Sequence, residues 1–385
     1  MKKREASIEY KVSDTAAYLL QIIRSSLNGE PTPEKPESVT WAQLFSMSKR
    51  QSLALLVYDR VRNLENGPQG ELLKKWRNWA DKMMTKGVNQ TLGCAELMDA
   101  LDRAKIRTLP MKGYYIRTAY PAPELREMMD IDILVEGNLS DEMQSAMRSI
   151  GYEQTAAHDL HATYTKKPYL MVEAHSKLLP DYVGHGDYYQ DIWSRVTPEK
   201  DRPSICHLSV SDTFIYILLH FVKHFTKNSS CGIRFAIDFY TYCRYYEKEM
   251  DWAYIWKELE KLGVKDLAED VLGLGQAWFG NGEMTQRQME MGMRMASGGV
   301  FGSREGRDHN QIMNYAAKSG SVRIGKLKFF LSAVFPPLEE MKRTRPALQK
   351  APILLPFFWI GRGFKILFTA PKQIVQYIKR IQKAG

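Results

Sequence analysis

The eight residues MMDIDILV, at 128–135, constrain the fold more than any other part of the chain. Asp130 and Asp132 stand two positions apart in a run of apolar residues, and period-two alternation is typical of a half-buried strand. The apolar residues expected on the opposite face are Met129, Ile131, Ile133 and Val135. The pattern predicts a strand that directs two carboxylates to one side of a sheet.

The residues before this strand have the pattern of helices. Apolar residues three and four positions apart predict amphipathic helices over 14–27 and 41–63. A longer helix is expected over 69–105, interrupted or bent near Gly87 or Gly93. The first hundred residues are therefore predicted to be a helical module.

Further strands are expected on both sides of the central one. A short β-prone run at 106–109 precedes it, and a helix capped by Ser140 follows it. Two more strands, at 161–167 and 168–178, are expected to meet at Pro168 as a hairpin. These elements predict a helix-flanked mixed sheet.

The chain becomes helical again after this sheet. Helical patterns cover 212–246, with a break at NSSCG, and 252–298, and a loop rich in Gly and Arg follows. The fold class expected is α+β, with a small mixed sheet flanked by helices and with helical modules at both ends. Four domains are predicted, which are 1–104, a helical module; 105–200, the core sheet; 201–300, a helical domain completing the cleft; and 301–385, a basic segment.

The cysteines and the N-terminus indicate where the protein resides. The four cysteines are scattered without a CxxC pair or zinc-ligand spacing, which favours a reducing cytoplasm. The N-terminus lacks the apolar region of a signal peptide, and no eighteen consecutive residues are apolar. We expect a cytoplasmic protein without a spanning helix, with peripheral membrane contact as an open alternative.

The net charge of +10 lies almost entirely at one end of the chain. From Gly320 onward there are thirteen Lys and Arg against two Glu, which leaves the first 319 residues at −1. Within this basic end, 351–360 is expected to pack against the protein. The stretch 364–383 is basic and amphipathic, and contact with an anionic membrane, packing on the protein and nucleic-acid binding all stay open for it.

Two carboxylates on one face of a strand can share a divalent cation or hold a pair of them. A two-metal phosphoryl-transfer site requires a further carboxylate. Glu173, in the alternating run MVEAH, supplies it if its strand lies beside that of Asp130 and Asp132 with Glu173 on the same face. The simpler alternative is that these acids are only solvated, since Asp-x-Asp recurs by chance.

The run LPMKGYYIRTAYPAPELREMMDIDILV at 109–135 resembles the signature of a known family. The family is the bacterial one labelled uncharacterised nucleotidyltransferase, in the DNA polymerase beta-like nucleotidyltransferase superfamily. Its pattern is a Lys-Gly turn, then Tyr-Pro, Arg and Asp-x-Asp. VEAH at 172–175 matches the third-carboxylate strand, with His175 lining the cleft, and the resemblance extends from Trp41 to Trp359.

The resemblance implies nucleotide-binding roles in the Lys-Gly turn. Gly113 would contact the triphosphate, Lys112 would place its ammonium on a phosphate oxygen, and Arg126 would clamp a phosphate or steady the carboxylates. The sequence departs from the superfamily pattern in two ways. Tyr114 follows the glycine, and Asp130 comes seventeen residues after it.

The resemblance also implies roles for two helical residues downstream. Lys223 matches a lysine that reaches the triphosphate, and Asp238 matches an aspartate that acts on the acceptor. Asp238 is expected either to accept a proton from the acceptor hydroxyl or to pair with Arg234. His220 and His224 have the spacing of zinc ligands, but no HExxH arrangement accompanies them.

The sequence predicts an enzyme that transfers a nucleoside monophosphate from an NTP to an acceptor and releases pyrophosphate. Asp130, Asp132 and Glu173 would hold Mg²⁺, for which Mn²⁺ can substitute. The acceptor, whether a small molecule, RNA or protein, is not identified. The alternative is a catalytically silent scaffold of this fold that binds a membrane-associated polysaccharide assembly or RNA.

Overall fold

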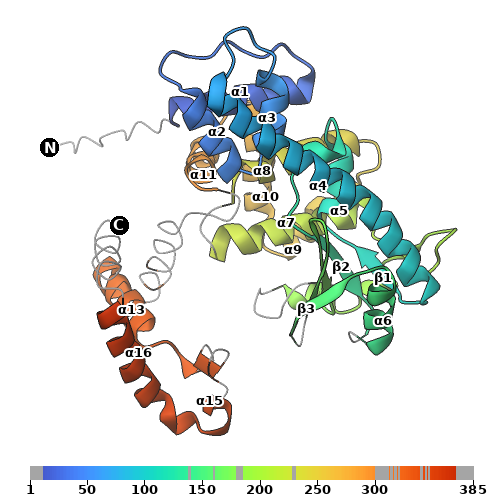
Figure 1. Ribbon diagram of the computed structural model, residues 1–385, viewed down its shortest axis with the longest axis vertical. Coiled ribbons are helices and arrows are strands. Elements are labelled where there is room, and N and C mark those ends of the chain that lie inside the picture. The colour runs from blue at the N-terminus through green and yellow to red at the C-terminus, as the bar shows by residue number, and fades with distance from the viewer. Residues whose placement is uncertain are drawn as a thin grey trace. The chain divides into compact units, whose positions relative to one another are not determined.

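A computed structural model shows how the chain folds (Figure 1). The residues that it describes are 12–137, 140–158, 161–178, 185–227, 231–299, 312, 315, 319, 321–338, 341–342, 345 and 347–369. The chain forms two compact units. Unit 1 comprises 1–223 and 231–300, and unit 2 comprises 224–230 and 301–385.

Unit 1 begins with four helices, which are α1 (Asp14–Asn28), α2 (Trp41–Arg50), α3 (Ala54–Val61) and α4 (Gly70–Arg103). The prediction of a single helix over 41–63 is wrong, because the chain turns at Ser52, whose φ is 53°. The adjacent Gln51 is buried and its amide donates to Met295 O and Gly298 O, both at 3.1 Å. The break thus places the Gln51 side chain so that its hydrogen bonds join the end of α2 to the end of α11 (Gln286–Ser297).

The helix α4 is continuous across both glycines, so it is not interrupted there, and the bend expected as the alternative stays a prediction. A Cβ at Gly93 would lie 2.8 Å from Leu170 Cδ1, and one at Gly87 would lie 3.1 Å from Glu124 Cβ. The glycines therefore permit close packing of α4 against the sheet and against the loop before its central strand, and they do not end the helix.

The sheet of unit 1 has five strands in the order β1-β2-β5-β4-β3. The strands are β1 (Thr108–Pro110), β2 (Ile131–Val135), β3 (Glu153–His158), β4 (His161–Lys166) and β5 (Leu170–His175). β2 and β5 are parallel and the other neighbours are antiparallel, so the sheet is mixed and the β4–β5 hairpin is as predicted. β3 was missed, because its sequence EQTAAH has none of the large β-prone residues that mark a strand.

One face of the sheet is covered by α4 and by α6 (Asp141–Ser149), which Ser140 caps as predicted (Figure 1). The hydrophobic core between them includes Leu97 and Met98 of α4, Met147 of α6, and sheet residues Ile133 and Val172. This packing directs the alternate side chains of β2 and β5 to the opposite face.

The prediction for β2 needs two corrections. Met129 was expected on the buried face, but it precedes the strand and is exposed. All five residues of β2 are buried, including Asp132 and Leu134, so the strand is covered on both sides. The side of β2 that carries the carboxylate is therefore a partly closed environment and not a solvent-facing surface.

Smaller elements surround the sheet. They are α5 (Gly113–Ile116), η1 (Arg117–Ala119), η2 (Pro123–Leu125), η4 (Gly186–Tyr189), η5 (Ile192–Ser194), β6 (Thr197–Pro198) and β7 (Cys206–His207). The later helices are α7 (Val210–Lys227), α8 (Ile233–Tyr245), α9 (Trp252–Lys261), α10 (Lys265–Phe279) and α11. The predicted helical stretches and the break between α7 and α8 are confirmed, and the fold class is α+β as predicted.

In unit 2 the described helical elements are α13 (Val322–Val334), α15 (Ala347–Lys350), η6 (Pro352–Leu354) and α16 (Leu355–Thr369). α13 and α16 pack together where Phe335 meets Trp359 edge to face at 5.4 Å between ring centroids. Arg362 donates to Ala333 O at 2.7 Å, and Trp359 Nε1 donates to Pro336 O at 2.9 Å. Most of the predicted loop after 298, and the side chains of 364–383, lie outside the described residues.

The domain boundaries given above stay a prediction. No helix among the described residues combines the length and the hydrophobicity needed to cross a bilayer.

Candidate functional site

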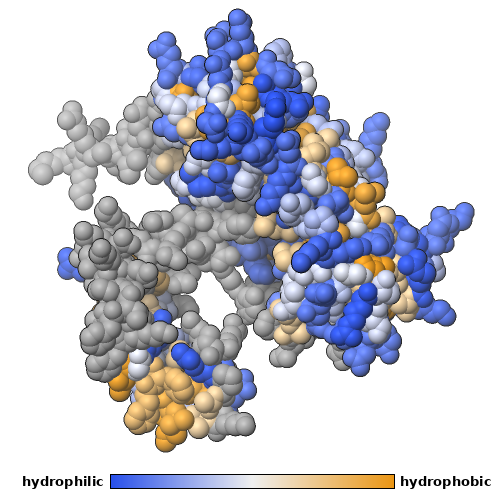
Figure 2. Space-filling model, viewed as in Figure 1, coloured by the Kyte–Doolittle hydropathy of each residue, from blue (hydrophilic) through white to orange (hydrophobic). Residues whose placement is uncertain are grey.

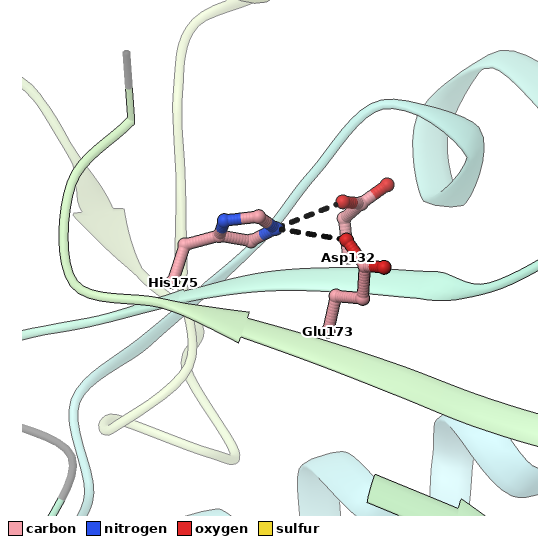
Figure 3. Close-up of side chains that lie close together, drawn as sticks. All are labelled: Asp132, Glu173 and His175. Carbon is pink, nitrogen blue, oxygen red and sulfur yellow. Dashed lines mark hydrogen bonds and ion pairs between the residues drawn. The ribbon is translucent and has the colours of Figure 1, made fainter. Parts of the chain in front are cut away.

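The register of two parallel strands brings together two of the three predicted acids, Asp132 and Glu173, and Asp130 lies outside the cluster that they form. Asp132 on β2 pairs with Glu173 on β5, so both side chains leave the sheet on the same face. His175, two residues after Glu173, lies on that face as well. Figure 3 shows the His175 ring directed toward both carboxylates.

Asp132, Glu173 and His175 form a cluster of metal-ligating side chains. His175 Nε2 lies 3.1 Å from Asp132 Oδ1 and 3.7 Å from Glu173 Oε2 (Figure 3). One ligand atom of each residue lies within 4.8 Å of the others, which is close enough for the three to surround one cation.

Lys112 is bonded to the same carboxylate as His175. Its Nζ lies 2.6 Å from Asp132 Oδ1. Burial lowers the pKa of Lys112, but the charge of Asp132 raises it above the usual range. Burial likewise raises the pKa of Asp132, but Lys112 and His175 hold it well below its usual range. The ammonium of Lys112 thus lies on the Asp132 carboxylate.

The backbone of Lys112 has a φ of 46° and a ψ of −107°. A residue with a Cβ in such a conformation stores about 1–3 kcal/mol of strain. Met111 N, immediately before it, donates to Asp132 O at 3.0 Å, which attaches this turn to β2. The turn is therefore held in a specific shape that aims the lysine at the site.

Asp130 immediately precedes β2 and is half-buried. Burial and the negative charge of Asp132 raise the pKa of Asp130 to about 6, with Lys112 acting against them. Lys86 of α4 also faces this carboxylate, and its Nζ donates to Met129 O at 3.1 Å. Asp130 thus lies among charged groups, and a bound cation would favour its ionised form.

Arg126 and Asp238, which were predicted as separate site residues, bond to each other. Arg126 Nε and Nη2 each donate to one Asp238 oxygen at 2.8 Å. Tyr120 Oη donates to Asp238 Oδ1 at 2.7 Å. Both charged side chains are buried. The expected pairing of Asp238 with Arg234 gives way to this bidentate pair, and Arg234 Nη1 donates instead to Glu127 O at 2.8 Å.

Gly113 begins α5 beneath this buried pair. A Cβ at this position would lie 2.8 Å from Met128 Sδ and 2.9 Å from Arg126 Nη1. The glycine is therefore required for close packing, and its predicted contact with a triphosphate stays a prediction.

Lys223, His220 and His224 all lie on α7, as predicted. Lys223 is partly buried, and its predicted contact with the triphosphate stays a prediction. The His220 ring stacks at 6.3 Å on Phe235 of α8. Among the described residues, the metal-ligating cluster is the one on β2 and β5 and does not include these histidines.

The donor set of the cluster suits a hard divalent cation in part. Asp132 and Glu173 offer carboxylate oxygens on neighbouring strands, and Asp130 precedes Asp132 by two residues. Carboxylate oxygens are the ligands that Mg²⁺ and Mn²⁺ prefer. His175 adds an imidazole nitrogen, which Mn²⁺ accepts more readily than Mg²⁺ does. The residues present therefore fit a divalent cation.

Two neighbours of this site, His175 and Lys86, were not predicted as members of it. His175 was expected only to line the cleft, although its position two residues after Glu173 on a strand puts both on one face. Lys86 carried no signal, because it lies on a helix more than forty residues before Asp130 in the chain.

Comparison with known proteins bears on the same region. A family model described as "Uncharacterised nucleotidyltransferase" matches residues 37–280. The match includes the whole sheet and the cluster on β2 and β5. It ends at residue 280, whereas the resemblance noted in the sequence extended to Trp359. No curated protein and no solved structure matches the chain.

Proposed function

The chain belongs to the family of uncharacterised nucleotidyltransferases, and we propose that it transfers a nucleoside monophosphate from an NTP to an acceptor, with release of pyrophosphate. The transfer would take place in the cytoplasm, where NTPs are abundant. The acceptor carries a hydroxyl or a phosphate, and small molecules, RNA and proteins all qualify because a fold does not select among them.

The observation that carries this proposal is the pairing of Asp132 with Glu173 across parallel strands. It brings two carboxylates 41 positions apart in the chain onto one face, with Asp130 beside them. Carboxylates that converge in this way, in a family of nucleotidyltransferases, support a site for a cation that carries a triphosphate.

In this proposal Asp130, Asp132 and Glu173 hold Mg²⁺, with Mn²⁺ as a substitute. When bound, the cation would neutralise charge on the phosphate oxygens as the bond to pyrophosphate breaks. His175 would orient the carboxylates through its contacts to Asp132 and Glu173. The contribution of the protein is positioning and charge stabilisation.

Lys112 would exchange its partner when a nucleotide binds. Its ammonium now lies on Asp132 Oδ1, where a cation would compete with it. A triphosphate offers this ammonium new oxygens within reach of the same turn. Gly113 and Lys223 remain proposed phosphate contacts on the strength of the family resemblance alone.

Arg126 and Asp238 support a positioning role better than a direct one. The bidentate bonds tie α8 to the loop that leads into β2, and they use the oxygens that a proton acceptor would need. We therefore propose that the pair fixes the approach to Asp130 and does not touch the acceptor.

A scaffold without transfer activity is the second candidate. The bond from Lys112 to Asp132 favours it, because an ammonium that stays in place would fill the position of a cation. In such a protein the fold would bind RNA or a polysaccharide assembly without metal.

A label-transfer assay separates these candidates. Purified protein is incubated with each of the four α-labelled NTPs, Mg²⁺ or Mn²⁺, and cell extract as a source of acceptor. Transfer by the wild type that Asp130→Ala abolishes, with the fold intact by circular dichroism, supports the enzyme. Transfer that survives in Asp130→Ala removes the assignment, and silence with all four NTPs supports the scaffold.

A further inference from the structure

The exposed hydrophobic side chains of unit 2 are the largest feature that nucleotidyl transfer does not explain. Among the described residues, seventeen large hydrophobic side chains are exposed, and ten of these lie between 322 and 360. They are Val322, Ile324, Leu327, Leu331, Val334, Phe335, Ile353, Leu354, Phe357 and Ile360. Figure 2 shows a hydrophobic patch over the first turns of α16. We call these ten residues the apolar surface.

The apolar surface comes from two packed helices. Leu327, Leu331 and Val334 recur on α13 at four- and three-residue spacing, and Phe357 and Ile360 do so on α16. The contact of Phe335 with Trp359 keeps these two helices together. Exposed apolar side chains at helical spacing on this packed pair of helices leave apolar surface open to a binding partner.

Basic side chains lie beside the apolar surface. Arg323, Lys328 and Arg345 are exposed within the same stretch. From Gly320 to the end of the chain the net charge is +11, whereas the first 319 residues sum to −1. A second copy of unit 2 would carry the same positive charge and would repel the first.

We propose that unit 2 docks on an anionic lipid bilayer, with the apolar surface inserted among the acyl chains and the basic residues on the headgroups. Apolar side chains flanked by Lys and Arg are what binding in the plane of a bilayer requires. Within 351–360, the stretch expected to pack on the protein, Trp359 packs on Phe335, whereas Ile353 and Phe357 are 83% and 70% exposed.

Co-sedimentation of the full chain with vesicles tests the proposal. We expect wild-type protein to pellet with vesicles of three parts phosphatidylcholine to one part phosphatidylserine, and to bind pure phosphatidylcholine at least tenfold more weakly. Ile353→Glu together with Phe357→Glu should reduce binding to the anionic vesicles at least tenfold. The matched control is Leu92→Glu on α4, at a side chain that is 66% exposed in unit 1, and it should bind as the wild type does.

Four outcomes overturn the proposal. The first is that wild-type protein stays in the supernatant with anionic vesicles. The second is that Leu92→Glu loses as much vesicle binding as the double variant does. A dimer in sedimentation velocity that the double variant converts to a monomer, without vesicle binding, assigns the apolar surface to a second copy. Binding of RNA in place of vesicles assigns the basic residues to nucleic acid. Activity in the label-transfer assay is independent of all of these results.

Discussion

Replacing Asp238 by asparagine tests whether the buried pair with Arg126 supports the fold or the chemistry. The carboxylate accepts two bonds from Arg126 at 2.8 Å and one from Tyr120 at 2.7 Å, and its side chain is 3% exposed. An asparagine side chain has a single acceptor oxygen and no charge, so the buried guanidinium loses its counter-ion. Breaking a buried pair by removing one partner costs about 3–5 kcal/mol.

The assay is urea denaturation followed by circular dichroism, with the free energy of unfolding compared between wild type and variant. The control is Asp270→Asn, because Asp270 also accepts from an arginine at 2.7 Å, but that arginine, Arg287, is 61% exposed. An exposed pair of this kind contributes less than about 1 kcal/mol. We expect Asp238→Asn to lose several times more stability than the control, while transfer activity per folded molecule is reduced only in part because the pair positions the site without taking part in the reaction. An unchanged free energy of unfolding with abolished turnover would refute this reasoning and make Asp238 a catalytic residue.

Further predictions concern the turn at Lys112 and the thiols. Lys112→Met should tighten Mn²⁺ binding about tenfold, because the charge-assisted bond of about 1.5 kcal/mol from Lys112 to Asp132 no longer competes with the cation. The same variant should bind NTP more weakly. Isothermal calorimetry measures both affinities, and an unchanged Mn²⁺ affinity would contradict the competition. Gly113→Ala should lower the free energy of unfolding by about 1–3 kcal/mol through overpacking against Arg126, and a neutral effect in urea denaturation would show that the contact relaxes. Cys94 and Cys231 are buried, and burial raises the pKa of Cys94 to about 11 and that of Cys231 well above its usual range. Neither thiol should therefore react with Ellman's reagent at pH 8 before urea is added, and rapid reaction of either in the native protein would contradict its burial.

Local patterns in the sequence predicted most elements correctly. The alternation around Asp132 and Glu173 identified β2 and β5, and three- and four-residue spacing identified most of the helices. Errors occurred where a tertiary contact overrides a local signal. The glycines of α4 suggested a break, but they accommodate Leu170 and Glu124, and Gln51 ends α2 early because its amide bonds elsewhere in the fold.

The candidate site depended on contacts that no local pattern encodes. The predicted metal site depends on Glu173 and Asp132 sharing one face of the sheet, and the sequence alone does not give the register of their strands. The parallel pairing of β2 with β5 provides that register. The bond between Arg126 and Asp238 joins residues 112 positions apart, and each had been given its own role from the family pattern. Such partners are set by how α8 packs on the loop before β2.

The central claim is that Asp132 and Glu173 hold a divalent cation for a nucleoside triphosphate. The most direct measurement is calorimetric binding of each NTP, with Mn²⁺ and with chelator, to the wild type and to Glu173→Gln. Glu153→Gln, on the exposed edge strand β3, is the matched control. We predict metal-dependent binding of at least one NTP that Glu173→Gln weakens at least tenfold and Glu153→Gln leaves unchanged. Binding that is equally strong in Glu173→Gln, or that persists with chelator, would contradict the claim.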